Sequence, residues 1–184
     1  MIPIAAFLSG AFLWTLLEYL IHRFLGHAHT KNPFGQEHVA HHSRGNYFAP
    51  WYKKLGAAAL LSALLLPPGL YFAGSAGGLF VGGLLLMYGS YELLHRLEHV
   101  HSGFGAYGRW ARRHHFYHHF HDPKMNHGVT TPIWDIVFGT YVPIEDPIEV
   151  PKKLQMAWLC DPTTQEVWPQ HAGDYALRGR KARV

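Results

Sequence analysis

The chain has 184 residues, enough for one domain, and 48% of them are hydrophobic while only 15% are charged. The formal net charge is +4. The sequence has no separate run of Lys and Arg interleaved with aromatic residues, which argues against nucleic acid as a partner. The single cysteine, Cys160, excludes an intrachain disulfide framework and a cysteine-based zinc finger.

Three apolar segments are predicted to span a membrane, at residues 2–21, 55–72 and 77–94. Each has about 18–20 residues, which at ~1.5 Å rise per residue is enough for a hydrocarbon core of ~30 Å. Pro67–Pro68 are expected to bend or end the second helix, and the glycine-rich residues 74–78 to form the turn before the third. The predicted fold class is therefore all-α, an integral membrane helix bundle of about three transmembrane helices.

The distribution of Lys and Arg predicts how these helices are oriented. Basic residues occur in the loop 22–54 and beyond His95, whereas the amino terminus and the turn at 73–76 have none. Because short cytoplasmic loops are enriched in Lys and Arg, loop 22–54 and the long carboxyl-terminal part are predicted to be cytoplasmic. The protein is thus expected to be a multi-pass membrane protein.

Beyond Val100 the sequence predicts a cytoplasmic cap. Residues 107–120 have helical character, and residues 128–141 are apolar and aromatic but too short to span, so they are expected to lie at the membrane interface. Three prolines then follow within nine residues. We therefore expect two regions, a membrane-bound domain at 1–142 and an extended, basic tail at 143–184.

Histidine is the most informative residue type in the chain. Ten of the 16 histidines fall into four short clusters, which are His22/His27, His38/His41/His42, His95/His99 and His115/His118/His119. Neutral imidazole is a strong ligand for iron, copper, nickel and zinc, and crowding it is costly unless something binds it. All four clusters lie on the predicted cytoplasmic side. Together they predict a centre of two metal ions with these ten histidines as ligands.

Helical spacing predicts which histidines share a face. His95 and His99 are four residues apart and should share a metal. In each three-histidine cluster, residues i and i+3 are expected to share a face, with the adjacent histidine rotated by ~100° toward a second metal. Spacing leaves two questions open, namely which metal each histidine binds and whether the last cluster uses His114 or His115. The role of His121 is also open. Four isolated histidines are expected not to be ligands: His29, His101, His127 and His171.

Four carboxylates are candidates for accepting a hydrogen bond from a ligand imidazole, which would fix its tautomer and orientation: Glu18, Glu92, Glu98 and Asp122. Glu18 lies inside the first apolar span, where an unpaired charge is costly. An equal alternative is an ion pair between Glu18 and Arg23 at the interface.

The donor set favours redox chemistry over hydrolysis. The His-Glu-x-x-His pattern of zinc proteases is absent, because the residue after His95 is Arg96. A hydrolytic zinc site also needs only about three protein ligands. Ten imidazoles near a membrane better suit two irons that activate dioxygen against unactivated C–H bonds.

Two stretches resemble the integral-membrane fatty acid hydroxylase superfamily, which includes sterol desaturases and sphingolipid hydroxylases. Residues 12–27, FLWTLLEYLIHRFLGH, resemble the first histidine box of its fatty acid 2-hydroxylase branch. His115-Phe-Tyr-His118-His119 and residues 128–141 resemble the last histidine box of that branch and the segment downstream of it. The resemblance covers about residues 12–142, favours His115 over His114, and implies a helix bundle under a cytoplasmic helical cap, with the dimetal centre between them.

The resemblance also implies an activity, cofactors and partners. Two iron ions, for which zinc can substitute in a purified form, would use O2 as co-substrate to insert oxygen into a C–H bond of a fatty acyl chain or related lipid. A separate cytochrome or ferredoxin with its reductase is expected as electron donor, because no residues precede the first span to hold a fused haem domain. The short form favours a bacterial inner membrane over the endoplasmic reticulum.

Other functions fit the same histidines. A lipid or sterol desaturase and a carotenoid hydroxylase would use similar boxes. From a different class, a membrane metal-binding or transport protein is also an alternative. A transporter needs ligands near the midplane of its helices, whereas these histidines lie at the ends of the spans and in the cap, which argues against it.

Overall fold

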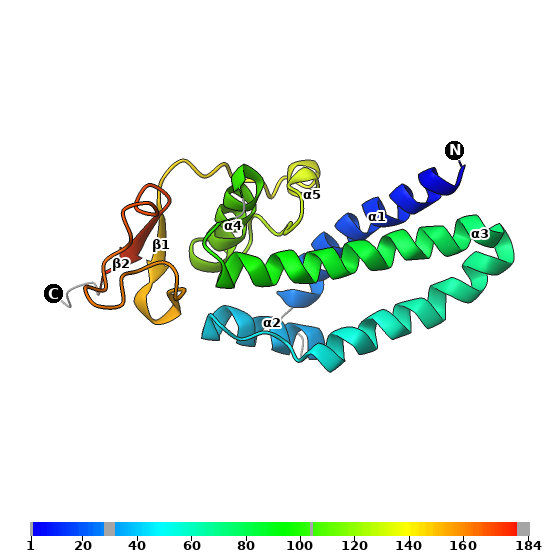
Figure 1. Cartoon of the computed structure of the whole chain (residues 1–184), viewed down its shortest axis with the longest axis horizontal. Helices are drawn as coiled ribbons and strands as arrows, with labels where there is room; N and C mark the ends of the chain where they lie inside the picture. The colour runs from blue at the N-terminus through cyan, green and yellow to red at the C-terminus, as the bar shows by residue number, and fades with distance from the viewer. Residues whose placement is uncertain (1, 28–31, 104, 180–184) are drawn as a thin grey trace.

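The computed structural model describes residues 2–27, 32–103 and 105–179 and is mostly helical (Figure 1). Its elements, in chain order, are α1 (Ile2–Leu20), a π-helix (Ile21–Gly26), α2 (Pro33–Arg44), α3 (Trp51–Val100), α4 (Gly105–Phe120), α5 (Ile133–Val137), β1 (Ile148–Pro151), a 3-10 helix (Lys152–Leu154) and β2 (Tyr175–Arg178).

The predicted second and third spans are the two arms of α3, which reverses direction in a hairpin at the right of Figure 1. The reversal occurs at Gly74, whose φ of 54° and ψ of −135° are non-helical and suit a residue without a side chain. Pro67 and Pro68 lie inside the first arm, and the helix continues past them to the glycine turn. The turn was therefore predicted correctly, but the prolines do not end the helix.

Close backbone contact holds α1 against the second arm of α3. A Cβ atom on Gly10 would lie 1.9 Å from the carbonyl oxygen of Phe80, and one on Gly83 would lie 2.0 Å from that of Phe7. Small residues allow such approach between membrane helices. Trp14, Leu84 and Tyr88 form the buried core between the two helices.

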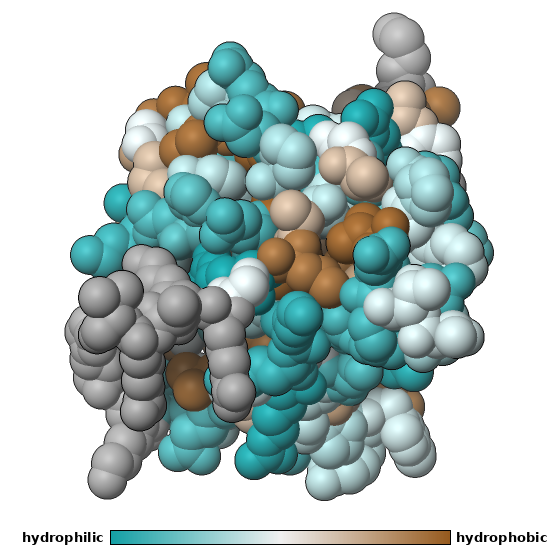
Figure 2. Space-filling view, turned by 90° about the vertical axis from the view of Figure 1, so that its left-hand side faces the viewer, coloured by the Kyte–Doolittle hydropathy of each residue, from teal (hydrophilic) through white to brown (hydrophobic). Residues whose placement is uncertain are grey.

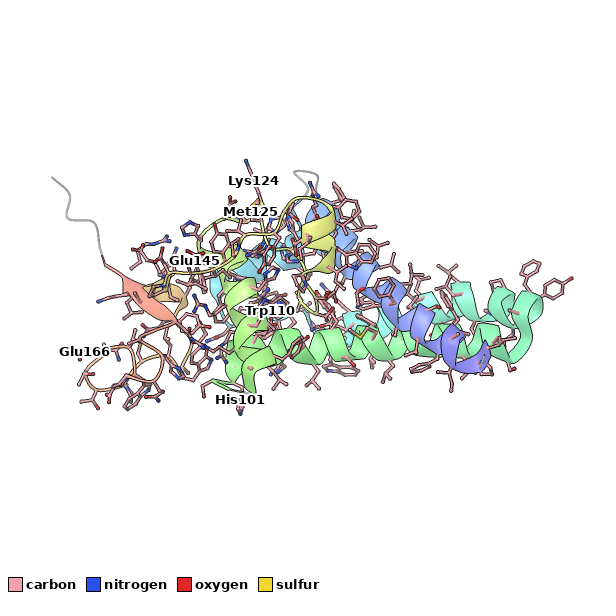
Figure 3. All side chains as sticks on the ribbon, turned by 90° about the horizontal axis from the view of Figure 1, so that it is seen from above. His101, Trp110, Lys124, Met125, Glu145 and Glu166 are labelled. Atoms are coloured by element: carbon pink, nitrogen blue, oxygen red, sulfur yellow. The ribbon has the colours of Figure 1, made fainter. Side chains whose placement is uncertain are left out.

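The polar end of the helices is covered by α2 and α4. Figures 1 and 3 show α4 crossing the second arm of α3 beyond the end of α1. Asn32 caps α2, because its side chain accepts a hydrogen bond from the backbone N–H of Gly35 at 2.7 Å. The histidines of α2 and α4 therefore meet those at the ends of the long helices.

The carboxyl-terminal segment differs from the extended tail that its prolines predict. β1 and β2 form a parallel two-stranded sheet with Ile148 opposite Tyr175, so the chain is not entirely α-helical. The segment packs on α4 through a buried core that comprises Phe116, Phe120, Ile148, Val150, Met156, Leu159, Cys160 and Tyr175. The two strands pair across more than twenty residues, a long-range contact that local sequence patterns do not reveal. Residues 180–184 of the predicted tail lie outside the described residues.

Two helical stretches are long and apolar enough to cross a membrane, Ile2–Gly26 and Trp51–Val100. Large apolar side chains are exposed along both, among them Leu8, Phe12, Leu60, Leu64, Leu86 and Leu93. In contrast, the end of the molecule formed by the carboxyl-terminal segment is mostly hydrophilic (Figure 2). Exposed apolar surface on this scale needs a partner or a membrane to cover it.

Candidate metal centre

The ten clustered histidines converge into two groups. The first histidine group comprises His22, His27, His38, His42 and His118, whose candidate ligand atoms all lie within 4.8 Å of one another. The second histidine group meets the same criterion with His41, His95, His99, His115 and His119. All ten predicted ligands are therefore brought together, five in each group, and the sequence alone had left this division open.

The spacing of the ring nitrogens fits a shared metal ion. In the first histidine group, Nε2 of His27 lies 2.9 Å from Nε2 of both His38 and His118. In the second, the Nε2 atoms of His41 and His95 are 2.9 Å apart, and those of His99 and His115 are 3.0 Å apart. Two nitrogens bound at right angles to one metal at ~2.1 Å are about 3.0 Å apart.

Hydrogen bonds to the opposite ring nitrogen direct several Nε2 atoms inward. Nδ1 of His22 donates to the carbonyl of His127 at 2.5 Å, and Nδ1 of His118 donates to that of Met125 at 2.8 Å. Nδ1 of His41 donates to the carbonyl of Tyr47 at 2.7 Å. Such bonds fix the tautomer that leaves Nε2 free to bind metal.

In the two histidine groups, the Nε2 atoms of His22, His42 and His119 are buried and have no hydrogen-bond partner among the described residues. A buried polar atom without a partner costs free energy unless a ligand satisfies it. These atoms, and the nitrogen-only donor set, fit two transition-metal ions.

The helices use i, i+4 pairs rather than the predicted i, i+3 pairs. His38 and His42 lie in the first histidine group while His41 turns to the second. His115 and His119 lie in the second group while His118 turns to the first. The reason is helical geometry, since a residue four positions on is rotated by only ~40° and a residue three positions on by ~60° in the opposite sense. His95 and His99 share a group as predicted.

A π-helix explains the five-residue spacing of His22 and His27. This π-helix, Ile21–Gly26, directly follows the last residue of α1. A π-helix makes hydrogen bonds from residue i to i+5, so residues five apart come to one face. His22 and His27 therefore both join the first histidine group.

Burial keeps the imidazoles outside the candidate spans neutral. It lowers the pKa of His41 to about 4 and that of His42 to about 2. The pKa values of His115 and His119 are also well below their ordinary range, first because of burial and then because of neighbouring histidines. Neutral imidazole is the form that binds metal, so these side chains are ready to bind at pH 7.

Three of the four candidate carboxylates bond elsewhere. Glu18 accepts hydrogen bonds from the N–H and hydroxyl of Thr130, at 2.9 and 2.7 Å, and Arg23 donates instead to the hydroxyl of Tyr19. Glu92 pairs with Lys54. Asp122 accepts from the backbone N–H of Lys124. The fourth, Glu98, is fully buried, and one of its oxygens lies 4.0 Å from Nε2 of His115.

Asp135 is a buried acidic residue that spacing arguments missed. Its carboxylate accepts hydrogen bonds from the N–H groups of His127 and Gly128, the hydroxyl of Thr140 and Nε2 of His114. Burial by itself would raise the pKa of Asp135, but the bonds from His114, Thr140 and Gly128 hold it below its ordinary value. The sequence signal was a single acidic residue inside the apolar segment 128–141.

The other described histidines lie outside both groups. Nε2 of His114 lies 3.1 Å from Asp135, whereas His115 lies in the second histidine group. His121 lies against the ring of Tyr117, and the ring of His171 packs on Trp158. His127 contributes its backbone carbonyl to His22. His101 accepts a hydrogen bond from the N–H of Gly103, and His29 lies outside the described residues.

The surface opens next to the first histidine group. A groove of about 320 Å³ is lined by His27, His38 and His42 together with Val39, Ser43 and Pro123. A second, apolar groove of about 520 Å³ runs along α1 and is lined by Leu8, Ser9, Phe12, Leu13, Leu16, Phe80 and Trp134. The indole N–H of Trp134 donates to the hydroxyl of Thr15 at 2.9 Å and so holds this ring beside α1.

Comparison with known proteins gives a consistent result. The model of the fatty acid hydroxylase family matches residues 7–140. The fatty acid 2-hydroxylase of Homo sapiens is 32% identical over 149 residues, which cover 74% of this chain and 39% of the relative. The ceramide very long chain fatty acid hydroxylase SCS7 of Saccharomyces cerevisiae is 32% identical over 164 residues, covering 77% and 39%.

A solved structure is also similar. Full-length scs7p, in which only the hydroxylase domain is visible, aligns with a TM-score of 0.63 and 27% identity over 80% of this chain and 59% of that chain. The chain thus spans about two fifths of the length of the two curated relatives above. Both come from eukaryotes, so the preference for a bacterial inner membrane gains no support from them.

Proposed function

Because the chain belongs to the fatty acid hydroxylase family, we propose that it is a membrane-bound, O2-dependent diiron hydroxylase. Its reaction would insert one oxygen atom into a C–H bond of a fatty acyl chain or related lipid. The observation that carries this proposal is the convergence of ten imidazoles, five in each histidine group, at the polar end of apolar helices.

Iron is proposed as the resident metal because the reaction needs redox chemistry. Iron bound by nitrogen ligands supplies the change of oxidation state that activates O2, which zinc does not. The two histidine groups would each hold one ion. The backbone carbonyls that accept from Nδ1 of His22, His41 and His118 would hold those rings in place during turnover.

Three membrane spans are proposed, α1 and the two arms of α3. The exposed apolar side chains on both helices support this arrangement, since apolar surface is stable in contact with lipid. The histidines would then lie on the cytoplasmic side under α2 and α4, in line with the positions of Lys and Arg. The hydroxylase domain is proposed to end near residue 142, since the family match ends at residue 140.

The groove along α1 is proposed to guide the acyl chain. In the proposed arrangement of spans, its apolar lining would face the acyl chains of the membrane. Trp134 lines the groove and donates a hydrogen bond to Thr15 of α1. Restricting the chain to one path lets only one carbon approach the metals, which converts binding into positional selectivity.

Each turnover consumes O2, two electrons and two protons, and yields the alcohol and one water. We assign the electron supply to a separate cytochrome or ferredoxin with its reductase. The groove beside His27 and His42 brings the protein surface close to the first histidine group, where a donor would need to approach.

Lipid mass spectrometry tests the function. Membranes of an aerobic host that expresses the chain with an electron donor would be compared with membranes containing His118→Ala. A gain of one oxygen in an acyl chain that depends on the unaltered chain supports the hydroxylase. Loss of two hydrogens would identify a desaturase instead, and no lipid change with two metals bound would indicate a metal-handling protein.

A further inference from the structure

The loop between α4 and α5 provides two of the backbone carbonyls that orient ligand imidazoles. Met125, labelled in Figure 3, accepts from Nδ1 of His118, and His127 accepts from Nδ1 of His22. Both imidazoles belong to the first histidine group. The orienting carbonyl identified for the second group comes from Tyr47, which follows α2. Among the described residues, the carbonyls of Met125 and His127 therefore accept from imidazoles of the first histidine group alone.

Asp135 holds the shape of this loop through hydrogen bonds to its backbone. Its two oxygens accept from the N–H groups of His127 and Gly128, each at 2.8 Å. The hydroxyl of Thr140 donates at 2.7 Å and Nε2 of His114 at 3.1 Å. Asp135 and His114 are fully buried, so these bonds are shielded from water.

One peptide group joins Asp135 directly to His22. The N–H of Gly128 donates to Asp135, and the carbonyl of the same peptide bond, that of His127, accepts from Nδ1 of His22. A carboxylate that accepts from the N–H end of a peptide increases the negative charge on its carbonyl oxygen. The stronger carbonyl holds the Nδ1 proton of His22 more firmly and makes Nε2 a better donor to a metal.

We propose that Asp135 is a positioning residue for the first histidine group alone. It acts through the peptide His127–Gly128 on His22, and through the loop on His118, without touching either metal. The proposal rests on the dimetal centre proposed above.

Cobalt binding to the full chain in detergent micelles tests this role. Two backgrounds separate the metal positions: His95→Ala/His99→Ala leaves the first histidine group complete, and His27→Ala/His38→Ala leaves the second complete. We expect Asp135→Asn to weaken Co²⁺ binding ~10–100-fold in the former background and to leave it unchanged in the latter. The absorption spectrum of bound Co²⁺ should also change only in the former, because ligand geometry at that ion changes.

Asp174→Asn is the matched control. Asp174 is also a buried aspartate with several donors, since it accepts from Arg109 and Arg113 at 2.6–2.7 Å, but it lies in the carboxyl-terminal segment. It should leave Co²⁺ affinity unchanged in both backgrounds. If Asp135→Asn does not fold, His114→Phe removes one of the four donors and should produce a smaller effect of the same selectivity.

The outcomes separate the two proposals. If the unaltered chain binds fewer than two Co²⁺ ions, the dimetal centre itself is wrong. If it binds two and both Asp135→Asn and His114→Phe leave the first position unchanged, or weaken both positions equally, the role of Asp135 is wrong.

Discussion

The imidazole rings of His42 and His119 stack in parallel, with centroids 3.9 Å apart and 2° between their planes. The two residues belong to different histidine groups, so this stacked pair forms part of the wall between them. His42 comes from the end of α2 and His119 from the end of α4. Each ring therefore supports the position of the other, and we expect the removal of one ring to be felt by the other group.

This contact makes His42 different from the other members of its group. His42→Ala should remove the metal of the first histidine group and also weaken Co²⁺ binding at the second, because His119 loses the ring that it packs against. His27→Ala should affect the first position only. Co²⁺ titration of both variants in detergent checks this. Equal effects of the two substitutions at the second position would contradict the linkage.

Activity should depend on the converging histidines and not on the isolated ones. His118→Ala removes a buried, proposed ligand and should lower hydroxylated product by more than about 100-fold, beyond the ~10–100-fold cost of altering an outer partner. It should also lower bound metal from two ions to one. His171→Ala should change neither value, since its ring packs on Trp158 and belongs to neither group. Full activity of His118→Ala, measured by lipid mass spectrometry, would refute the ligand assignment.

The two metals should leave at different rates in a chelator. The first histidine group borders the groove at Val39 and Pro123, which gives a chelator a path to it. We expect EDTA to release metal in two phases of equal amplitude, measured by elemental analysis after rapid desalting. Val39→Trp, which places a large aromatic ring at an exposed position in the groove, should slow the fast phase only. Release of both ions in one phase would argue against this difference.

Acid should destabilise the metal-free protein. Burial lowers the pKa of His41 and His127 to about 4 in the folded chain, whereas an unfolded histidine titrates near 6.5. The unfolded state therefore binds more protons below pH 6.5, and the free energy of unfolding falls as the pH falls toward about 4. Each group contributes up to ~1.4 kcal/mol per pH unit in this window. Thermal melting in detergent at pH 7.5, 6 and 5 measures the effect, and a constant Tm would contradict it.

Helix packing should depend on one of two adjacent glycines. Gly83→Ala places a Cβ 2.0 Å from the carbonyl oxygen of Phe7, so α1 must move away, at a cost of ~1–3 kcal/mol or more. At Gly82 a Cβ meets nothing within 4 Å, and Gly82→Ala should be neutral or slightly stabilising through helix propensity. Melting temperatures of the two variants in the same detergent give a direct comparison. Similar values would show that the close contact is not needed.

The sequence alone identified the residues that converge at the candidate metal centre. Clustered imidazoles and apolar blocks are local features, so the ten converging histidines and the candidate membrane helices were both found from spacing and composition. The glycine turn at Gly74 was found in the same way, because glycine-rich segments favour turns wherever they occur.

Only the tertiary structure decided the division of the histidines into two groups, the separation of His114 from His115, and the hydrogen bonds of Asp135. Each depends on which distant segments face one another, as when Asp135 receives hydrogen bonds from His114 and Thr140 at once. The fold of the carboxyl-terminal segment was hidden for the same reason, since β1 gains its partner strand from residues 175–178. Spacing along one helix specifies the direction of a side chain, but the neighbour in that direction is set by long-range packing.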